Sequence, residues 1–197
     1  MVVLQVLALV GYTGFLTATF GWRTLQTKRV TGESRWRLPV SGTDAIGETV
    51  CAAGCLLSLI APPLAIAGAV SPLRADWPTA QGTGFAITLG FGTILAIWAQ
   101  RHLAEEWRAG VEASDTLVTA GPFARIRNPF YLGCFLASTS VVAAVPSTAA
   151  LVGLVLHIAA AEIIVRGVEE PILAEVHGTA FFNYKQRTGR FLPRITT

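Results

Sequence analysis

The chain has 197 residues, of which 52% are hydrophobic and 14% charged, with a formal net charge of +3. Soluble globular domains carry about 25% charged residues, so this composition excludes an ordinary soluble enzyme. The length favours a single domain over residues 1–197. The few charged residues cluster between long uncharged stretches, which makes membrane-spanning helices the first structure to consider.

Uncharged stretches predict five helices that span a membrane, because about 20 apolar residues in a helix cross its hydrocarbon core. The first covers residues 2–22, the second residues 49–70 and the third residues 83–100. The last two share residues 130–161. Within them, Pro146-Ser147-Thr148 predicts a tight turn, because proline breaks a helix and serine or threonine caps the next one. The predicted fold is an all-α integral membrane protein.

The positive charges predict how the chain is oriented. In a five-span arrangement, all of the 15 lysines and arginines except Arg74 lie on one side. Positive residues favour the cytoplasmic side, so we expect the N-terminus outside and the C-terminal tail inside. This asymmetry explains the pI of about 9.0 and implies no nucleic-acid partner. No basic segment precedes the first span, so we expect a retained anchor rather than a cleaved signal peptide.

The cysteines and histidines show no pattern of a metal site. Cys51 and Cys55 share one helix face, but two thiols lack the four ligands of a structural zinc site. We therefore expect all three cysteines to be small packing residues and predict no metal. The three histidines are expected to be interfacial or packing residues rather than bases; they are His102, His157 and His177.

Polar residues suited to chemistry concentrate in the second half of the chain. The stretch LVTAGPFARIRNPFYLG, residues 117–133, contains a Gly121-Pro122 turn and an Asn128-Pro129 helix stop. After the fifth span, Arg166, Glu169 and Glu170 lie at spacings that would bring both carboxylates near the guanidinium in an α-helix. Charges at a membrane helix end suggest function, although a salt bridge between Glu162 and Arg166 that only closes the bundle is an alternative.

The two stretches resemble a known family. LVTAGPFARIRNPFYLG resembles the signature L-V-T-x-G-[PV]-[YF]-x-x-x-R-[HN]-P-x-[YF]-x-G of the isoprenylcysteine carboxyl methyltransferases and their phospholipid-methyltransferase relatives. The tail EEPILAEVHGTAFFNYKQRTGRFLP is similar to the family's E-E-x-x-L-x-x-x-[FH]-G-x-x-[YF]-x-x-Y-x-x-x-x-x-x-x-x-P. Both motifs occur in the family's order, separated by a helical hairpin, and the resemblance covers about residues 98–193.

The resemblance implies an integral membrane carboxyl O-methyltransferase that uses S-adenosylmethionine, here in a bacterial inner membrane. Its methyltransferase core would cover residues 83–197, beside an N-terminal two-helix region at residues 1–70. The cofactor would lie in a cytoplasmic pocket formed by the loop before the fourth span and the C-terminal helix. The acceptor would be lipophilic, isoprenoid or lipid-like, and would enter from the lipid bilayer.

The family's site residues carry over to matching positions of this chain. Glu169 and Arg166 would be catalytic, with Glu169 also contacting the cofactor and Arg166 holding an acceptor carboxylate. The implied cofactor-binding residues are Gln100, Asp115, Thr116, Leu117, Val118, Gly121, Phe123, Arg127, Asn128, Pro129, Phe130, Tyr131, Glu169 and Glu170.

The chain departs from the family at three positions. Asn128 and Asp115 stand where eukaryotic members have histidine, and asparagine cannot act as a base near neutral pH. Val165 stands where those enzymes have the acceptor-binding arginine, with Arg166 one residue later. Two alternatives stay open: an NADPH-dependent membrane reductase of the sterol-reductase type, and a non-enzymatic membrane scaffold or transport component.

Overall fold

The computed structural model describes residues 2–21, 24, 42–70, 73, 78–103 and 117–194, and these residues are all-helical apart from short connections. Asp115 and Thr116, two of the predicted cofactor residues, lie outside this range. The elements in chain order are α1 (Val2–Leu16), η1 (Thr17–Gly21), α3 (Thr43–Ile66), α4 (Pro78–Leu103), η3 (Gly121–Ala124), α5 (Pro129–Ala144), α6 (Thr148–Ile164), η4 (Val165–Glu169) and α7 (Glu170–Arg187).

Four of the described helical stretches are long and apolar enough to cross a membrane. They are Val2–Gly21, Thr43–Ile66, Pro78–Leu103 and Thr148–Arg187, and α5 is a shorter apolar helix. The prediction of an all-helical protein with membrane-spanning helices is confirmed. The turn between α5 and α6 lies where the sequence predicts it, and the Ser147 hydroxyl caps α6 by accepting from the Ala150 amide at 3.3 Å. Five spans and their orientation stay predictions.

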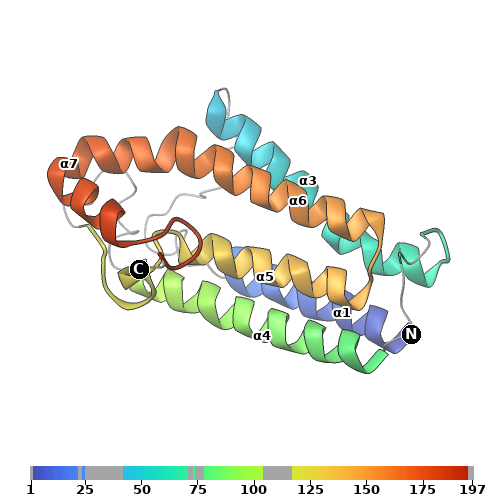
Figure 1. The fold of residues 1–197 in the computed structure, drawn as a ribbon. Coiled ribbons are helices and arrows are strands. Elements are labelled where there is room, and N and C mark those ends of the chain that lie inside the picture. The colour runs from blue at the N-terminus through green and yellow to red at the C-terminus, as the bar shows by residue number, and fades with distance from the viewer. Residues whose placement is uncertain are drawn as a thin grey trace.

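The helices pack in two antiparallel pairs, α4 with α5 and α3 with α6, and α1 contacts α3, α4 and α5. Figure 1 shows α6 continuing into α7 past the start of α5, after which α7 bends back. The bend occurs at Gly178, whose φ of 47° an L-residue rarely adopts. This return brings the C-terminal segment beside the start of α5, at the opposite end of the bundle from the N-terminus (Figure 1).

Small residues allow the close helix contacts that membrane proteins use in place of a hydrophobic driving force. A Cβ at Gly92 of α4 would lie 2.7 Å from the Gly133 carbonyl oxygen of α5, and a Cβ at Gly133 would lie equally close to the Gly92 oxygen. Large apolar side chains instead face outward, as a lipid environment requires. Phe91 is 69% exposed and Ile94 67% exposed.

The contact between α4 and α5 predicts a stability difference between two glycines of one helix. Gly92→Ala should destabilise the protein by about 1–3 kcal/mol, because the new methyl group meets backbone atoms that cannot move aside. Gly90→Ala is the control, since no atom lies within 4 Å of its added Cβ. Thermal unfolding in detergent measures both, and equal melting temperatures for the two variants would contradict the packing described here.

Candidate active site

The two motif stretches come together through backbone hydrogen bonds. The Arg127 amide donates to the Gly189 carbonyl at 2.8 Å, and the Asn128 amide donates to the Arg190 carbonyl at 3.0 Å. In return, the Gly189 amide donates to the Arg125 carbonyl at 3.1 Å. These bonds form an isolated parallel bridge between Ile126 and Gly189. The loop before α5 is therefore fixed to the segment after α7.

Glu170 fixes the same junction through its side chain. Arg190 donates to both carboxylate oxygens, from Nε to Oε1 and from Nη2 to Oε2, each at 2.9 Å. Arg127 donates to Oε1 from Nε at 3.3 Å and from Nη2 at 3.2 Å, and the Lys185 ammonium lies 3.6 Å from Oε2. Glu170 is only 8% exposed. One carboxylate thus joins the loop, α7 and the C-terminal segment in a charge-assisted network.

The positive neighbours decide how Glu170 titrates. Burial raises the pKa of this carboxyl, but the hydrogen bonds and charge of Arg190, with the charges of Arg127 and Lys185, outweigh burial and lower it to about 2. The pKa of Arg190 is raised in turn by its bonds to Glu170. Glu170 therefore stays ionised at any physiological pH, so it acts as a fixed anion and not as a general base.

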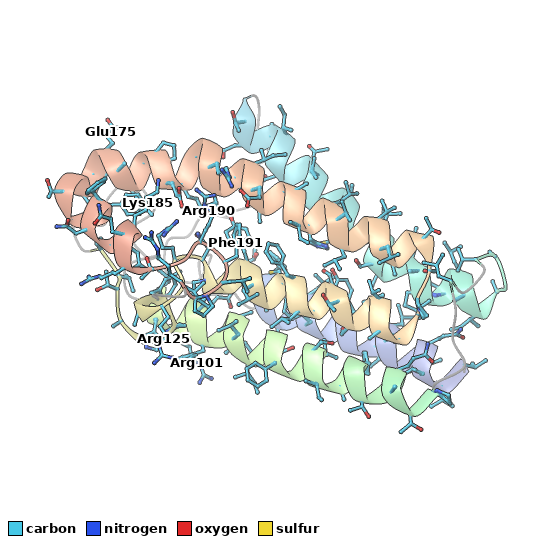
Figure 2. The ribbon with its side chains drawn as sticks, in the orientation of Figure 1. Arg101, Arg125, Glu175, Lys185, Arg190 and Phe191 are labelled. Carbon is cyan, nitrogen blue, oxygen red and sulfur yellow. The ribbon has the colours of Figure 1, made fainter. Side chains whose placement is uncertain are left out.

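Glu169, the neighbouring carboxylate, has a different environment. The Tyr131 hydroxyl donates to its Oε1 at 2.8 Å, which links the first turn of α5 to the end of η4. The Tyr131 ring meets Phe130 edge-on, with centroids 5.8 Å apart, and Phe191 at 6.3 Å. Figure 2 shows Phe191 and Arg190 in the region between α7 and the start of α5. An aromatic wall therefore lies beside the carboxylate of Glu169.

The Gly121-Pro122 turn packs between α4 and α7. Gly121 has a φ of 58°, and a Cβ there would collide with the His102 ring, so only glycine fits. Phe123 is buried, and its carbonyl accepts from the Tyr184 hydroxyl at 2.7 Å. Burial raises the pKa of Tyr184 to about 12, which keeps this donor protonated. Leu117 and Val118 precede the turn and are half-buried.

Two predicted cofactor residues connect the site to the N-terminal helices. The Gln100 side-chain amide donates to the Thr19 carbonyl of η1 at 2.8 Å. Phe130 meets Phe20 edge-on, with centroids 5.8 Å apart. Pro129 occupies the first turn of α5, and the Asn128 side-chain amide donates to the Arg190 carbonyl at 3.3 Å. Asn128 therefore holds the junction through both its backbone and its side chain.

Arg166 lies elsewhere than the α-helical spacing predicts. Its Nε donates to Glu162, the pair that the sequence offers as an alternative to a functional role, and its side chain is 62% exposed. Glu170, which we expected beside Arg166, is bound by Arg127 and Arg190 instead. The physical reason is η4: residues Val165–Glu169 form a π-helix, which has more residues per turn than an α-helix and changes the i,i+4 alignment.

Arg190 and Lys185 were not among the site residues predicted from the sequence. Both lie inside the tail motif, at positions the motif leaves unspecified, so no pattern marked them. One signal was available: a glutamate that is buried at a helix start needs cationic partners, and these basic residues follow it in the chain. Figure 2 shows Lys185 on the inner side of α7 and Glu175 on its outer side.

The titration of Glu170 predicts how stability depends on pH. Because the pKa in the folded protein, about 2, lies below the ordinary 4.5, the stabilisation is complete above pH 4.5 and is lost as the pH falls toward 2. At neutral pH it amounts to about 3 kcal/mol. Glu170→Gln should remove this stabilisation and flatten the stability profile in this range. Denaturant unfolding in detergent between pH 7 and pH 3 measures it.

Glu175→Gln on the exposed side of α7 is the matched control and should leave the profile unchanged. If Glu170→Gln and Glu175→Gln unfold alike at neutral pH, Glu170 does not hold the junction.

Comparison with known proteins gives one family match. Residues 82–180 match the family model of phospholipid methyltransferase, which covers α4, the site loop, α5, α6 and the first half of α7. A search of the curated proteins gives no match. The matched segment contains Tyr131, Glu169 and Glu170 together with most of the loop that they hold, and it is half of the chain. The chain therefore belongs to the phospholipid methyltransferase family, within the isoprenylcysteine carboxyl methyltransferase-like group.

Proposed function

We propose that this membrane methyltransferase uses S-adenosylmethionine to methylate a lipophilic acceptor at the cytoplasmic face of the membrane. The observation that carries the proposal is the 2.8 Å hydrogen bond from Tyr131 to Glu169, which unites the two motif stretches at one point. The family match supports the reaction class, and the apolar helices support access from the lipid bilayer.

The residues around Glu169 suit the methyl donor. When bound, S-adenosylmethionine supplies a methyl group on a sulfonium, which passes to the acceptor nucleophile and leaves a neutral thioether. A carboxylate such as Glu169 can accept hydrogen bonds from an amine or a diol, and Tyr131 orients it. Aromatic faces attract cations, so Tyr131 and Phe123 fit an adenine ring or the sulfonium.

Arg127 and Glu170 contribute by shaping the wall of the site. Both are predicted cofactor residues, and the Glu170 carboxylate accepts hydrogen bonds from Arg127 and from Arg190. Arg127 also donates to the Thr188 carbonyl at 2.6 Å. Such a network holds the loop in place without further reorganisation, and positioning supplies much of the acceleration in a methyl transfer.

The acceptor would approach from the membrane side, near Arg166. This guanidinium is exposed and bonds only Glu162 among the described residues, so it is available for an acceptor carboxylate. The Asn128 side-chain amide donates to the Arg190 carbonyl, which supports a mechanism without a base at that position. The core at residues 83–197 would do the chemistry, while residues 1–70 complete the bundle through Thr19 and Phe20.

Calorimetry with the purified protein tests the donor. Wild type should bind S-adenosylmethionine and not NADPH. Glu169→Gln should weaken binding about 10-fold or more, because a charged hydrogen bond contributes about 1.5–3 kcal/mol. Tyr131→Phe removes one hydrogen bond to the carboxylate and keeps its charge, so it should weaken binding less, and Glu175→Gln should bind as wild type does.

Two results would reject the donor proposal. Absence of S-adenosylmethionine uptake at millimolar concentration in wild type would exclude a methyltransferase of this kind. Binding of NADPH in its place would favour the reductase. Uptake of neither ligand would favour the non-enzymatic scaffold.

A reporter fused after Pro193 tests the orientation. The five-span arrangement places this position in the cytoplasm, so a fluorescent protein should be active there and a periplasmic phosphatase inactive. Fusion after Ala69, in the connection that follows α3, should give the opposite pattern. An active phosphatase after Pro193 would refute both the orientation and the cytoplasmic site.

A further inference from the structure

A cluster of metal-binding side chains lies between α3 and α6, away from the methyltransferase site. Cys51 and Cys55 of α3 and His157 of α6 place their ligand atoms all within 4.8 Å of one another. The Cys55 sulfur lies 3.1 Å from His157 Nε2. In tetrahedral zinc sites with sulfur and nitrogen ligands, neighbouring donor atoms are about 3.5–3.8 Å apart, so the three atoms need only a small adjustment to surround one ion.

His157 is oriented as a metal ligand requires. Its Nδ1 lies 2.9 Å from the Gly153 carbonyl oxygen. A carbonyl only accepts hydrogen bonds, so Nδ1 carries the proton and Nε2 presents its lone pair to the cysteines. Histidines that bind metals commonly donate their other nitrogen in this way, which fixes the ring and its tautomer. The Ser138 hydroxyl also lies 3.0 Å from Nδ1.

The backbone is shaped to bring these ligands together. Gly54 and Gly153 let α3 and α6 approach: a Cβ at Gly54 would lie 3.0 Å from the Gly153 carbonyl oxygen and 3.1 Å from His157 Nδ1. Cys51 and Cys55 are one helical turn apart and therefore face the same side of α3. The Tyr12 hydroxyl of α1 lies 3.5 Å from Nε2.

We propose that Cys51, Cys55 and His157 bind one zinc ion that fastens α3 to α6 inside the membrane. Thiolates and imidazole are the ligands that zinc prefers in proteins. Binding would release the two thiol protons, and two thiolates, a neutral imidazole and Zn²⁺ have no net charge. A neutral complex avoids the cost of a charge in hydrocarbon, whereas the same ligands around Cu⁺ would leave one negative charge.

The ion would join α3, which lies outside the residues that match the family, to α6, which lies within them. α3 lies before residue 82 and α6 within residues 82–180. Among the described residues, this cluster supplies the only side-chain hydrogen bond between α3 and α6. The role is therefore structural, and the methyl transfer does not require the ion to take part.

The metal content of the full-length protein, purified in detergent without added metal, tests the proposal. Mass spectrometry of the element should find about one zinc per chain in wild type, and Cys55→Ser and His157→Gln should each retain less than about one fifth of that amount. Cys134→Ser removes a buried thiol of α5 that is not in the ligand set, and should keep its zinc. A chelator should lower the melting temperature of wild type and leave that of Cys55→Ser unchanged.

Cobalt replacement gives a readout that does not need the variants to fold. Co²⁺ added to the chelated wild type should produce the thiolate-to-cobalt charge-transfer absorption of a sulfur-ligated ion. Absence of zinc and of this absorption in wild type would overturn the proposal. So would copper in place of zinc, equal zinc in Cys55→Ser, or an equal loss in Cys134→Ser, which would indicate general capture by thiols.

Discussion

The site end of the molecule depends on one buried carboxylate. Glu170 is held by Arg190 at 2.9 Å and by Arg127 at 3.2 Å, and these two arginines belong to segments that the chain separates by the whole α5–α6 hairpin and α7. Removing one partner of a buried ionic group leaves the other charges uncompensated. The free-energy cost of these charges exceeds the net stabilisation that the ion pair provides. The loop, the start of α7 and the C-terminal segment are therefore stable only together. The aromatic wall beside Glu169 is built on this arrangement, because Phe191 directly follows Arg190.

Two adjacent glutamates acquire different tasks from the local helix geometry. Glu169 closes the π-helix η4 and turns to Tyr131, while Glu170 opens α7 and turns to the arginines. A uniform α-helix would place both carboxylates on the side of Arg166, as the sequence spacing predicts. π-helical turns are frequent at functional sites, and here the turn lies where the last membrane helix becomes the helix that carries the tail motif. It separates the carboxylate that binds the two arginines from the carboxylate that accepts from Tyr131.

The sequence predicted the features that composition and local chemistry control. Helices, their apolar lengths and the turn at Pro146 follow from hydropathy and proline, and they are confirmed. The Glu162–Arg166 pair, which i,i+4 spacing offers as an alternative to a functional role, is also present. The pairing of α4 with α5 through Gly92 and Gly133 could not be predicted, because every span contains glycine and nothing in the sequence matches one glycine to its partner. The partners of Glu170 are also long-range, since neither Arg127 nor Arg190 stands at a spacing that marks it. The roles of the predicted cofactor residues stay predictions, and Asp115 and Thr116 lie outside the described residues.

The cluster of Cys51, Cys55 and His157 is another long-range contact that the sequence does not mark. Cys51 and Cys55 alone predict packing, because the third ligand follows 102 positions after Cys55 and only the pairing of α3 with α6 brings it near. Polar groups in a membrane interior are costly unless they are paired, and this cluster pairs His157 with thiol, hydroxyl and carbonyl groups from four helices. A protein that needs only apolar packing between α3 and α6 has no use for that arrangement. The position of Nε2 beside the Cys55 thiol, with Cys51 on the same helix face and the ring fixed by the Gly153 carbonyl, is what favours a metal ion over simple helix packing.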